Sequence, residues 1–300
     1  MATNHWKTIS PEKSQGVIRG VIPSKKRVQR TYDVLSEGWG DIKKSIARIS
    51  SGYDNRIMGE VKSYLKSLNH AGYPMIADFG CGPGKQLAQC LVMMVAGHCV
   101  GIDISAAMLD RARNKLEYLA RNKDVSLQLT CCDASCTPLP DMSVDLSYAK
   151  MLLHHVSKPI AVLREMARVT RTGGRVLVMV PGVNYQARTS VGNSEWFSHF
   201  PRSIDDPVCD PLGRFTVQYL QEIASHVGIS TPRTIADQFE YQFETVRDYL
   251  KFMQLTGADS KMRGYGRSNW IDSYDNVISK AKGVVCLMCE FITLVGVMDR

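Results

Sequence analysis

The stretch ADFGCGPGKQLAQCLVMMVAGHCVGID, residues 77–103, decides the fold of this chain. Its pattern is that of a short apolar strand, a glycine-rich turn, an amphipathic helix and a second apolar strand. The turn carries Gly80, Gly82 and Gly84 in alternation, and glycine adopts positive φ freely and lets a ligand approach the backbone. The helix expected over 85–97 presents unpaired N–H groups in its first turn. The stretch therefore predicts a ligand site at this turn.

Two acids and the glycine spacing indicate the class of ligand. Asp103 ends the second strand, where sheets of this kind hold ribose hydroxyls. The spacing is G-x-G-x-G, followed by Lys85, whereas dinucleotide folds carry G-x-G-x-x-G. Asp78 precedes the turn and suits a ligand with a positively charged amino group. These features favour S-adenosylmethionine (SAM), which has an ammonium group, a ribose and an adenine, over a dinucleotide.

Length and composition are those of a globular protein. The chain has 300 residues, of which 44% are hydrophobic and 22% charged. It starts without an apolar leader, and its longest apolar run, 283–298, contains Glu290 and is too short to span a membrane. Nine cysteines without a secretory signal predict reduced thiols in a cytoplasmic protein. Cys286 and Cys289 lack a second ligand pair, so core packing is favoured over a metal site.

Positive charge is concentrated at the N-terminus. Residues 1–30 hold seven Lys or Arg and one acid, and thus six of the eight net positive charges. We expect a basic, loosely ordered arm over 1–30 that is a solvated tail and not a nucleic-acid clamp. A helical cap over 31–70 is expected at the mouth of the ligand site, followed by the sheet domain over 71–300.

The rest of the chain alternates between strand and helix patterns. Further strands are expected at 126–130, from 144, at 175–180, near 234–239 and at 289–297, with helices at 56–68, 105–122, 159–170, 216–227 and, as a pair, 244–281. Such alternation predicts an α/β fold with a seven-stranded, mostly parallel sheet covered by helices on both faces. Insertions near 183–214 and 241–275 are expected to cover the acceptor as lids.

At the level of whole motifs, the chain resembles the class I SAM-dependent methyltransferases, and among them the small-molecule group called methyltransferase type 11. The resemblance covers roughly residues 53–180. It is carried, in order, by Asp78-x-Gly80-x-Gly82-x-Gly84, Gly101-Ile102-Asp103-Ile104-Ser105, Cys132-Asp133-Ala134, Leu139-Pro140 with Asp145-Leu146, Leu153-His154-His155-Val156, and Arg168-Val169 with Gly173-Gly174. The implied fold is Rossmann-like, and the implied activity is methyl transfer from SAM.

The resemblance also implies a set of cofactor-binding residues. Asp78 and the loop Gly80, Cys81, Gly82 and Gly84 would hold the methionine end, and Asp103 the ribose. The adenine would lie against Ile104, Met108, Cys132, Asp133 and Ala134, with Ala149 at the end of the fourth strand. An alternative for Asp103 and Asp133 is that strand-end aspartates cap the next helix. Their register behind the loop favours binding over capping.

A histidine pair follows the fourth strand, at the edge where the methyl group is expected. Adjacent residues of a helical turn point about 100° apart, so at most one of His154 and His155 faces that group. The resemblance favours His155 as a base or an orienter of the acceptor, and in some relatives this histidine works with a tyrosine of the N-terminal segment. Tyr53 is the partner expected here. A histidine that only bonds its own loop remains an alternative.

The stretch AKML at 149–152 replaces the Asn-Pro-Pro-Tyr of enzymes that methylate glutamine or nucleobase nitrogens. Lys150 is cationic where metal-dependent catechol methylation needs an acid. We therefore expect a small-molecule methyl acceptor. One alternative is an RNA or tRNA methyltransferase that uses the basic arm, and another is a SAM-binding regulatory protein without turnover.

Overall fold

Seven strands form a single sheet. The computed structural model describes residues 25–26, 28–30, 32–33, 36, 52–68, 73–121, 123–189, 215–244, 248 and 285–299. The strands are β1 (Met75–Phe79), β2 (Ala96–Asp103), β3 (Asp124–Cys131), β4 (Val144–Lys150), β5 (Thr170–Thr189), β6 (Ile229–Phe243) and β7 (Val285–Met298). Their order is β3-β2-β1-β4-β5-β7-β6, and β7 runs antiparallel to both neighbours while the other pairs are parallel. The predicted seven-stranded, mostly parallel α/β sheet is confirmed.

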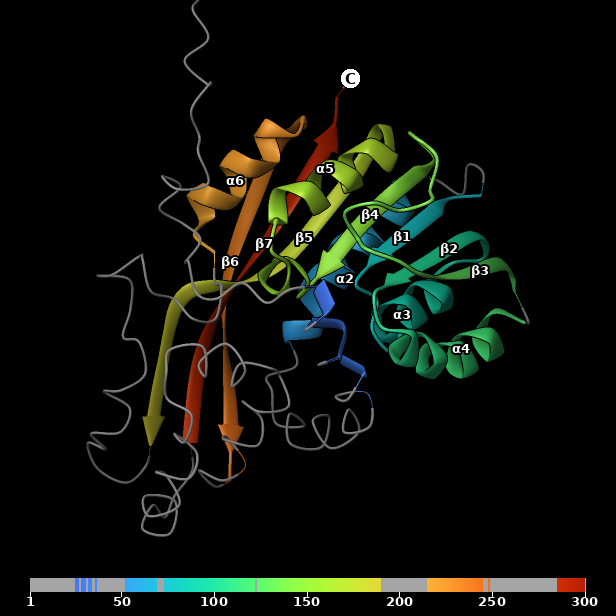
Figure 1. The fold of residues 1–300 in the computed structure, drawn as a ribbon. Coiled ribbons are helices and arrows are strands. Elements are labelled where there is room, and N and C mark those ends of the chain that lie inside the picture. The colour runs from blue at the N-terminus through green and yellow to red at the C-terminus, as the bar shows by residue number, and fades with distance from the viewer. Residues whose placement is uncertain are drawn as a thin grey trace, which may run out of the picture.

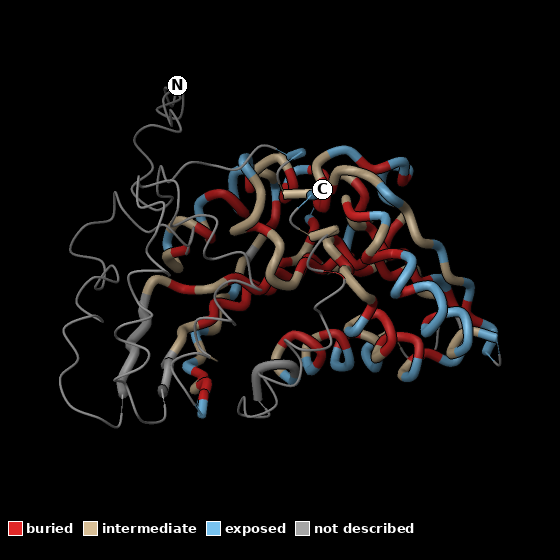
Figure 2. The backbone as a smooth tube through the Cα atoms, turned by 60° about the horizontal axis from the view of Figure 1, so that its bottom comes forward, coloured by how far each residue is buried: buried red, intermediate tan, exposed pale blue. Residues whose placement is uncertain are grey.

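Helices cover both faces of this sheet (Figure 1). One apolar core joins the sheet to α2 (Gly52–Ser67), α3 (Lys85–Met93) and α4 (Ala106–Ala120), and the other joins it to α5 (Pro159–Val169) and α6 (Val217–His226). Buried residues lie along the strands and on the inner faces of the helices (Figure 2). Helix α2 is tied to β6 by Arg56, whose Nε and Nη2 donate to Asp237 at 2.6 and 2.7 Å. Among the described residues, no helix has the length and apolar character needed to cross a membrane.

Close packing around the first loop requires glycine. Gly84 has φ of 74°, and a Cβ built there would lie 2.7 Å from Leu116 Cδ1 on α4. A side chain at this position would therefore meet both backbone strain and a steric clash. Gly82, at φ 51°, has nothing within 4 Å of the same built position. The loop is thus anchored against α4 at one glycine and open at the other.

Three strands are longer than their sequence patterns predict. β5 was expected to end at Pro181-Gly182 but continues to Thr189, because its ladder with β7 shifts register between Pro181 and Tyr185 and so accommodates the proline. β6 and β7 pair along this extension, which reaches beyond the rest of the sheet (Figure 1). Residues 183–189 of the expected lid thus belong to β5, and the rest of it lies outside the described residues.

Other boundaries differ less. The expected helix 85–97 ends at Met93, because Gly97 (φ 131°) already belongs to β2 and its built Cβ would lie 2.5 Å from the Pro74 carbonyl. β6 ends at Phe243, so the expected lid at 241–275 begins as strand. The rest of that lid and of the helical pair expected over 244–281 falls outside the described residues, apart from Glu244 and Asp248.

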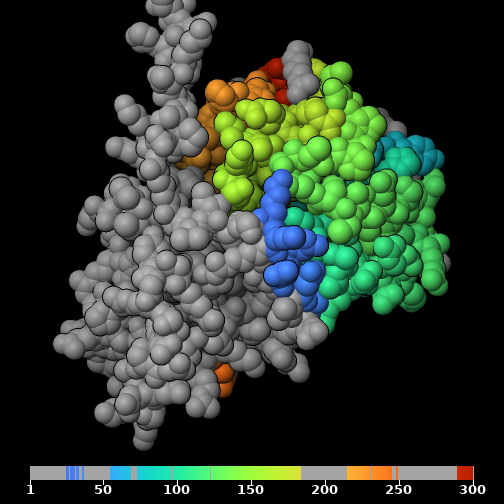
Figure 3. All heavy atoms as spheres, in the orientation of Figure 1, coloured from blue at the N-terminus to red at the C-terminus, as the bar shows by residue number. Residues whose placement is uncertain are grey.

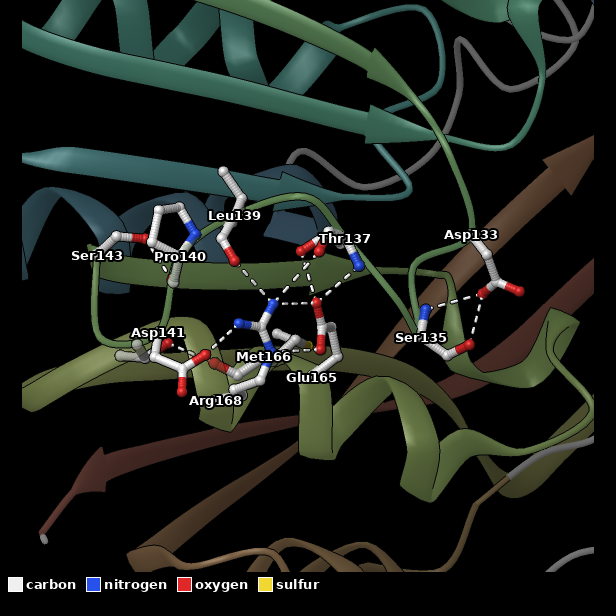
Figure 4. Close-up of polar contacts among 11 residues, drawn as sticks. Asp133, Ser135, Thr137, Leu139, Pro140, Asp141, Ser143, Glu165, Met166 and Arg168 are labelled. Carbon is white, nitrogen blue, oxygen red and sulfur yellow. Dashed lines mark hydrogen bonds and ion pairs between the residues drawn. The ribbon is translucent and has the colours of Figure 1, made fainter.

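The loop between β3 and β4 is fixed to α5 by a polar network (Figure 4). Glu165 is buried, and its Oε1 accepts from the backbone N and the hydroxyl of Thr137 at 2.7 and 2.6 Å. Arg168 donates from Nη2 to the same Oε1 at 2.6 Å and to the Leu139 carbonyl at 2.8 Å, and it pairs with Asp141. The pKa of Glu165 is lowered, since these bonds outweigh the effect of burial. The network holds the loop that carries Asp133.

Replacing Arg168 by alanine is expected to lower the free energy of unfolding by about 3 kcal/mol, because the carboxylate of Glu165 stays buried without its cation. Urea denaturation followed by circular dichroism measures this loss. Since the folded pKa of Glu165 lies below its ordinary value of 4.5, the loss is expected in full above pH 4.5 and shrinks as the pH falls further. Arg164→Ala, exposed on the same helix, is the control, and equal losses in both variants would contradict the network's role.

Candidate functional site

The predicted site residues gather at one edge of the sheet, where the parallel strands end. The glycine loop follows β1, Asp103 ends β2, Asp133 follows β3, and the histidine pair follows β4 within the 3-10 turn η1 (Leu153–His155). Carboxyl ends of neighbouring parallel strands meet at one edge, and ligands of open α/β sheets bind there. The topology thus brings together residues that lie far apart in the sequence.

Asp103 joins the loop to helix α4. Its Oδ2 accepts from the backbone N of Gly82 at 2.8 Å, and its Oδ1 accepts from the backbone N of Ser105 at 2.9 Å. Ser105 itself caps α4 through its hydroxyl, which accepts from Met108 N at 3.2 Å. Asp103 therefore does not cap this helix. Burial raises the pKa of Asp103, and the backbone hydrogen bonds act against that rise.

Asp78 lies beneath the loop, with only 2% of its surface exposed. Its Oδ2 accepts from the hydroxyl of Tyr148 on β4 at 2.9 Å. Burial raises the pKa of Asp78 to about 7, opposed by the Tyr148 hydrogen bond. Sequence reasoning missed Tyr148, whose position in the apolar pattern of β4 indicates a buried side chain but not its partner.

Asp78→Asn is expected to remove a pH dependence of stability. Between pH 3.8 and about 7 the folded protein holds the Asp78 proton more tightly than the unfolded chain does, so wild-type stability falls as the pH rises through this range. At pH 8 the variant is expected to be more stable by about 4 kcal/mol, and at pH 4 the two are expected to match. Thermal unfolding from pH 4 to 8 measures the difference. Parallel curves for the two proteins would contradict the burial of an ionisable carboxyl.

Asp133 lies at the end of β3 and is held from two sides. Its Oδ1 accepts from the backbone N and the hydroxyl of Ser135, both at 2.8 Å, and its Oδ2 forms an ion pair with Lys25. Although partial burial raises the pKa of Asp133, Lys25 and Ser135 lower it below its ordinary value. The carboxylate is therefore charged and able to accept from an amine.

The described residues of 25–36, here called the N-terminal segment, lie across this edge (Figure 3). Lys25 pairs with Asp133, the Ser105 hydroxyl donates to Asp33 Oδ1 at 2.6 Å, and Tyr32 bonds His155. The three contacts reach groups that follow three different strands. Residues 25–26 and 28–30 of the expected arm are helical, and Lys25 forms an ion pair with a carboxylate of the site. The other residues of 1–30 lie outside the described part of the chain.

His155 contacts a tyrosine that sequence reasoning did not select. Its Nε2 lies 2.7 Å from the Tyr32 hydroxyl, and the two rings meet edge to face at 5.3 Å. The ring of His154 lies 3.8 Å from that of His155, and both histidines are half-buried. Burial, and then the charge of Asp103, raises the pKa of Tyr32 far above its ordinary value, so its hydroxyl stays protonated. The side chain of Tyr53, the expected partner, lies outside the described residues.

Some of the other predicted cofactor-binding residues are buried and some are partly exposed. Cys81, Met108, Ala134 and Ala149 are buried at this edge, and Gly80, Ile104 and Cys132 are partly exposed. Gly80 lies against Leu152, 2.9 Å from the position of a built Cβ. The site fits SAM in its donors and acceptors, because open space beside Gly82 admits a ligand to the backbone and Asp103 and Asp133 are carboxylate acceptors for hydroxyl and amine groups.

Comparisons with known proteins agree with this geometry. Residues 77–178 match the family model described as "Methyltransferase domain". The 27-O-demethylrifamycin SV methyltransferase of Amycolatopsis mediterranei is 36% identical over 155 residues, which cover 48% of this chain and 53% of that protein. The tRNA (carboxymethyluridine(34)-5-O)-methyltransferase of Macaca fascicularis is 25% identical over 150 residues, covering 45% of this chain and 20% of that protein.

A solved structure shows the same fold over nearly the whole chain. It is the [4+2]-cyclase SpnF, with a TM-score of 0.56 and 16% identity, covering 95% of this chain and 98% of SpnF. The matched part of this chain spans from a fifth to about half of the length of the curated relatives. Residues 77–178 are a methyltransferase domain of the SAM-dependent kind, and its cofactor is SAM.

Proposed function

We propose that this protein transfers the methyl group of SAM to a small-molecule acceptor. The observation that carries the proposal is the N-terminal segment, which lies across the strand ends through Lys25, Asp33 and Tyr32. A segment held there by three contacts covers part of the strand ends, which favours a compact acceptor over a nucleic-acid duplex. Lys25 is engaged by Asp133 of the site itself, so this part of the basic arm does not serve phosphates. A relative with a small-molecule name, the rifamycin methyltransferase, supports the same acceptor class.

Methyl transfer from SAM requires the protein mainly to align the acceptor with the methyl group. SAM supplies a methyl group already activated on a sulfonium, so the chain must orient the acceptor and exclude water. Asp103 holds the loop through Gly82 and would bind the ribose, and Asp133, which is held by Ser135, would bind the adenine amine. The Tyr32 hydroxyl and His155 Nε2 share a hydrogen bond that orients the ring. In this proposal the Tyr32 oxygen takes the proton that an acceptor hydroxyl or amine releases, while Tyr32 passes its own hydroxyl proton to His155 Nε2.

Two other functions are each supported by an observation and are tested in the same experiment. The basic N-terminus and the tRNA methyltransferase among the relatives favour an RNA acceptor. The name of SpnF indicates that this fold also serves a reaction other than methyl transfer. A SAM-binding protein without methyl turnover is therefore the second rival.

The free thiols of the seven described cysteines fit the cytoplasmic location that we propose for the protein.

Transfer of labelled methyl from SAM separates these functions. The protein is incubated with a cell extract and labelled SAM, and metabolites, lipids, RNA and protein are then fractionated. Label in the metabolite or lipid fraction is expected. Label in RNA, lost when residues 1–24 are deleted, would overturn the small-molecule proposal. Bound SAM with no label in any fraction would favour the rival without turnover.

A further inference from the structure

Asp33 brings a carboxylate from the N-terminal segment into the cofactor site. Its Oδ1 accepts from the Ser105 hydroxyl at 2.6 Å, and the backbone N of Ser105 donates to Asp103 at 2.9 Å. Ser105 is fully buried and Asp33 is partly exposed, so this bridge is partly shielded from solvent. Asp33 and Asp103 are therefore both bonded to Ser105. No local sequence pattern predicts that these two carboxylates lie close together.

Two carboxylates of the site lack a cationic partner. Asp33 and Asp103 lie on either side of Ser105, and among the described residues neither forms an ion pair with a Lys or Arg. Lys25 of the same segment pairs with Asp133 instead. Like charges this close cost free energy unless a cation enters between them.

The two forms of the cofactor differ in this property. SAM carries a sulfonium, an ammonium and a carboxylate, for a net charge of about +1, whereas S-adenosylhomocysteine (SAH) has a neutral thioether and a net charge of about zero. We propose that Asp33 is a specificity-determining residue that makes the site prefer the cationic SAM over its neutral product. The inference rests on the proposed function. It gives the N-terminal segment a role in product release, because loss of the sulfonium charge removes its attraction to Asp33.

The test is calorimetric titration of the full chain with three ligands: SAM, SAH and sinefungin, in which a protonated amine replaces the sulfonium. Asp33→Asn keeps an oxygen that accepts from Ser105 and removes only the charge. It is expected to weaken SAM and sinefungin about tenfold and SAH by less than about twofold. Asp110→Asn, exposed on α4, makes the same change in net charge and is expected to leave all three affinities unchanged.

The outcomes are distinct. Equal weakening of all three ligands by Asp33→Asn would show that Asp33 only positions the segment, and unchanged affinities would show that it does not act on the ligand; either result overturns the inference. The wild type binding SAM, with the same ratio of SAM affinity to SAH affinity as Asp33→Asn, would also overturn the inference. That result would leave the proposed function intact. A wild-type protein that binds none of the three overturns the proposed function itself.

Discussion

Replacing Asp103 by alanine is expected to weaken SAM binding about hundredfold, because each hydrogen bond to a charged group contributes about 1.5–3 kcal/mol and the variant loses both its ligand contact and its bond to the loop. The carboxylate accepts from Gly82 N at 2.8 Å and from Ser105 N at 2.9 Å. Its removal frees the glycine loop and takes away the acceptor that we propose for the ribose hydroxyls. Calorimetric titration with SAM measures the loss.

Two controls give this result its meaning. Asp110→Ala changes an exposed aspartate on α4 and is expected to leave SAM affinity unchanged. Circular dichroism of Asp103→Ala at the titration temperature shows whether the sheet is intact. An intact variant that binds SAM as tightly as the wild type would remove Asp103 from the cofactor site.

The second large effect is expected at the histidine pair. His155→Ala is expected to lower kcat by about a hundredfold or more, the usual scale for loss of a positioned acid or base, while SAM affinity changes by less than about twofold. Tyr32→Phe removes the hydroxyl that lies 2.7 Å from His155 Nε2 and is expected to lower kcat about tenfold. The measurement is turnover with the acceptor found by the labelling experiment, alongside SAM titration.

His226→Ala, an exposed histidine at the end of α6, is the matched control for His155→Ala and is expected to keep full turnover. Full turnover in His155→Ala would show that the ring serves only the structure of its turn. Unfolding of that variant, with Tyr32→Phe fully active, would lead to the same conclusion.

The parts of the fold that follow from local pattern were predicted from the sequence. The glycine loop, the helix after it and the strand ending at Asp103 are encoded by residues close in the chain, so spacing alone places them. The Asp133 and His155 positions follow from the topological rule that parallel strands end at one edge. The resemblance to methyltransferases added the expected roles, and the matching family model confirms the family for residues 77–178.

What the sequence did not reveal depends on contacts between distant residues. Tyr32 and His155 are 123 positions apart, and their contact depends on how the N-terminal segment crosses the sheet edge, which no local period encodes. The Lys25–Asp133 pair was missed for the same reason, since a basic run normally indicates a solvated tail. The length of β5 was misjudged because proline ends a strand where the hydrogen-bonded ladder is regular. Here the β5–β7 ladder shifts register just after Pro181, so the strand continues.

SAM is expected to bind at the ends of β1, β2 and β3. Hydrogen exchange of the full chain with and without SAM, read by mass spectrometry, locates the binding site. Slower exchange is expected on SAM addition at 80–84, 103–108 and 133–135, where the loop, Asp103 and Asp133 lie. Unchanged exchange in all three segments at saturating SAM, or protection confined to β6 and β7, would show that SAM does not bind at these strand ends.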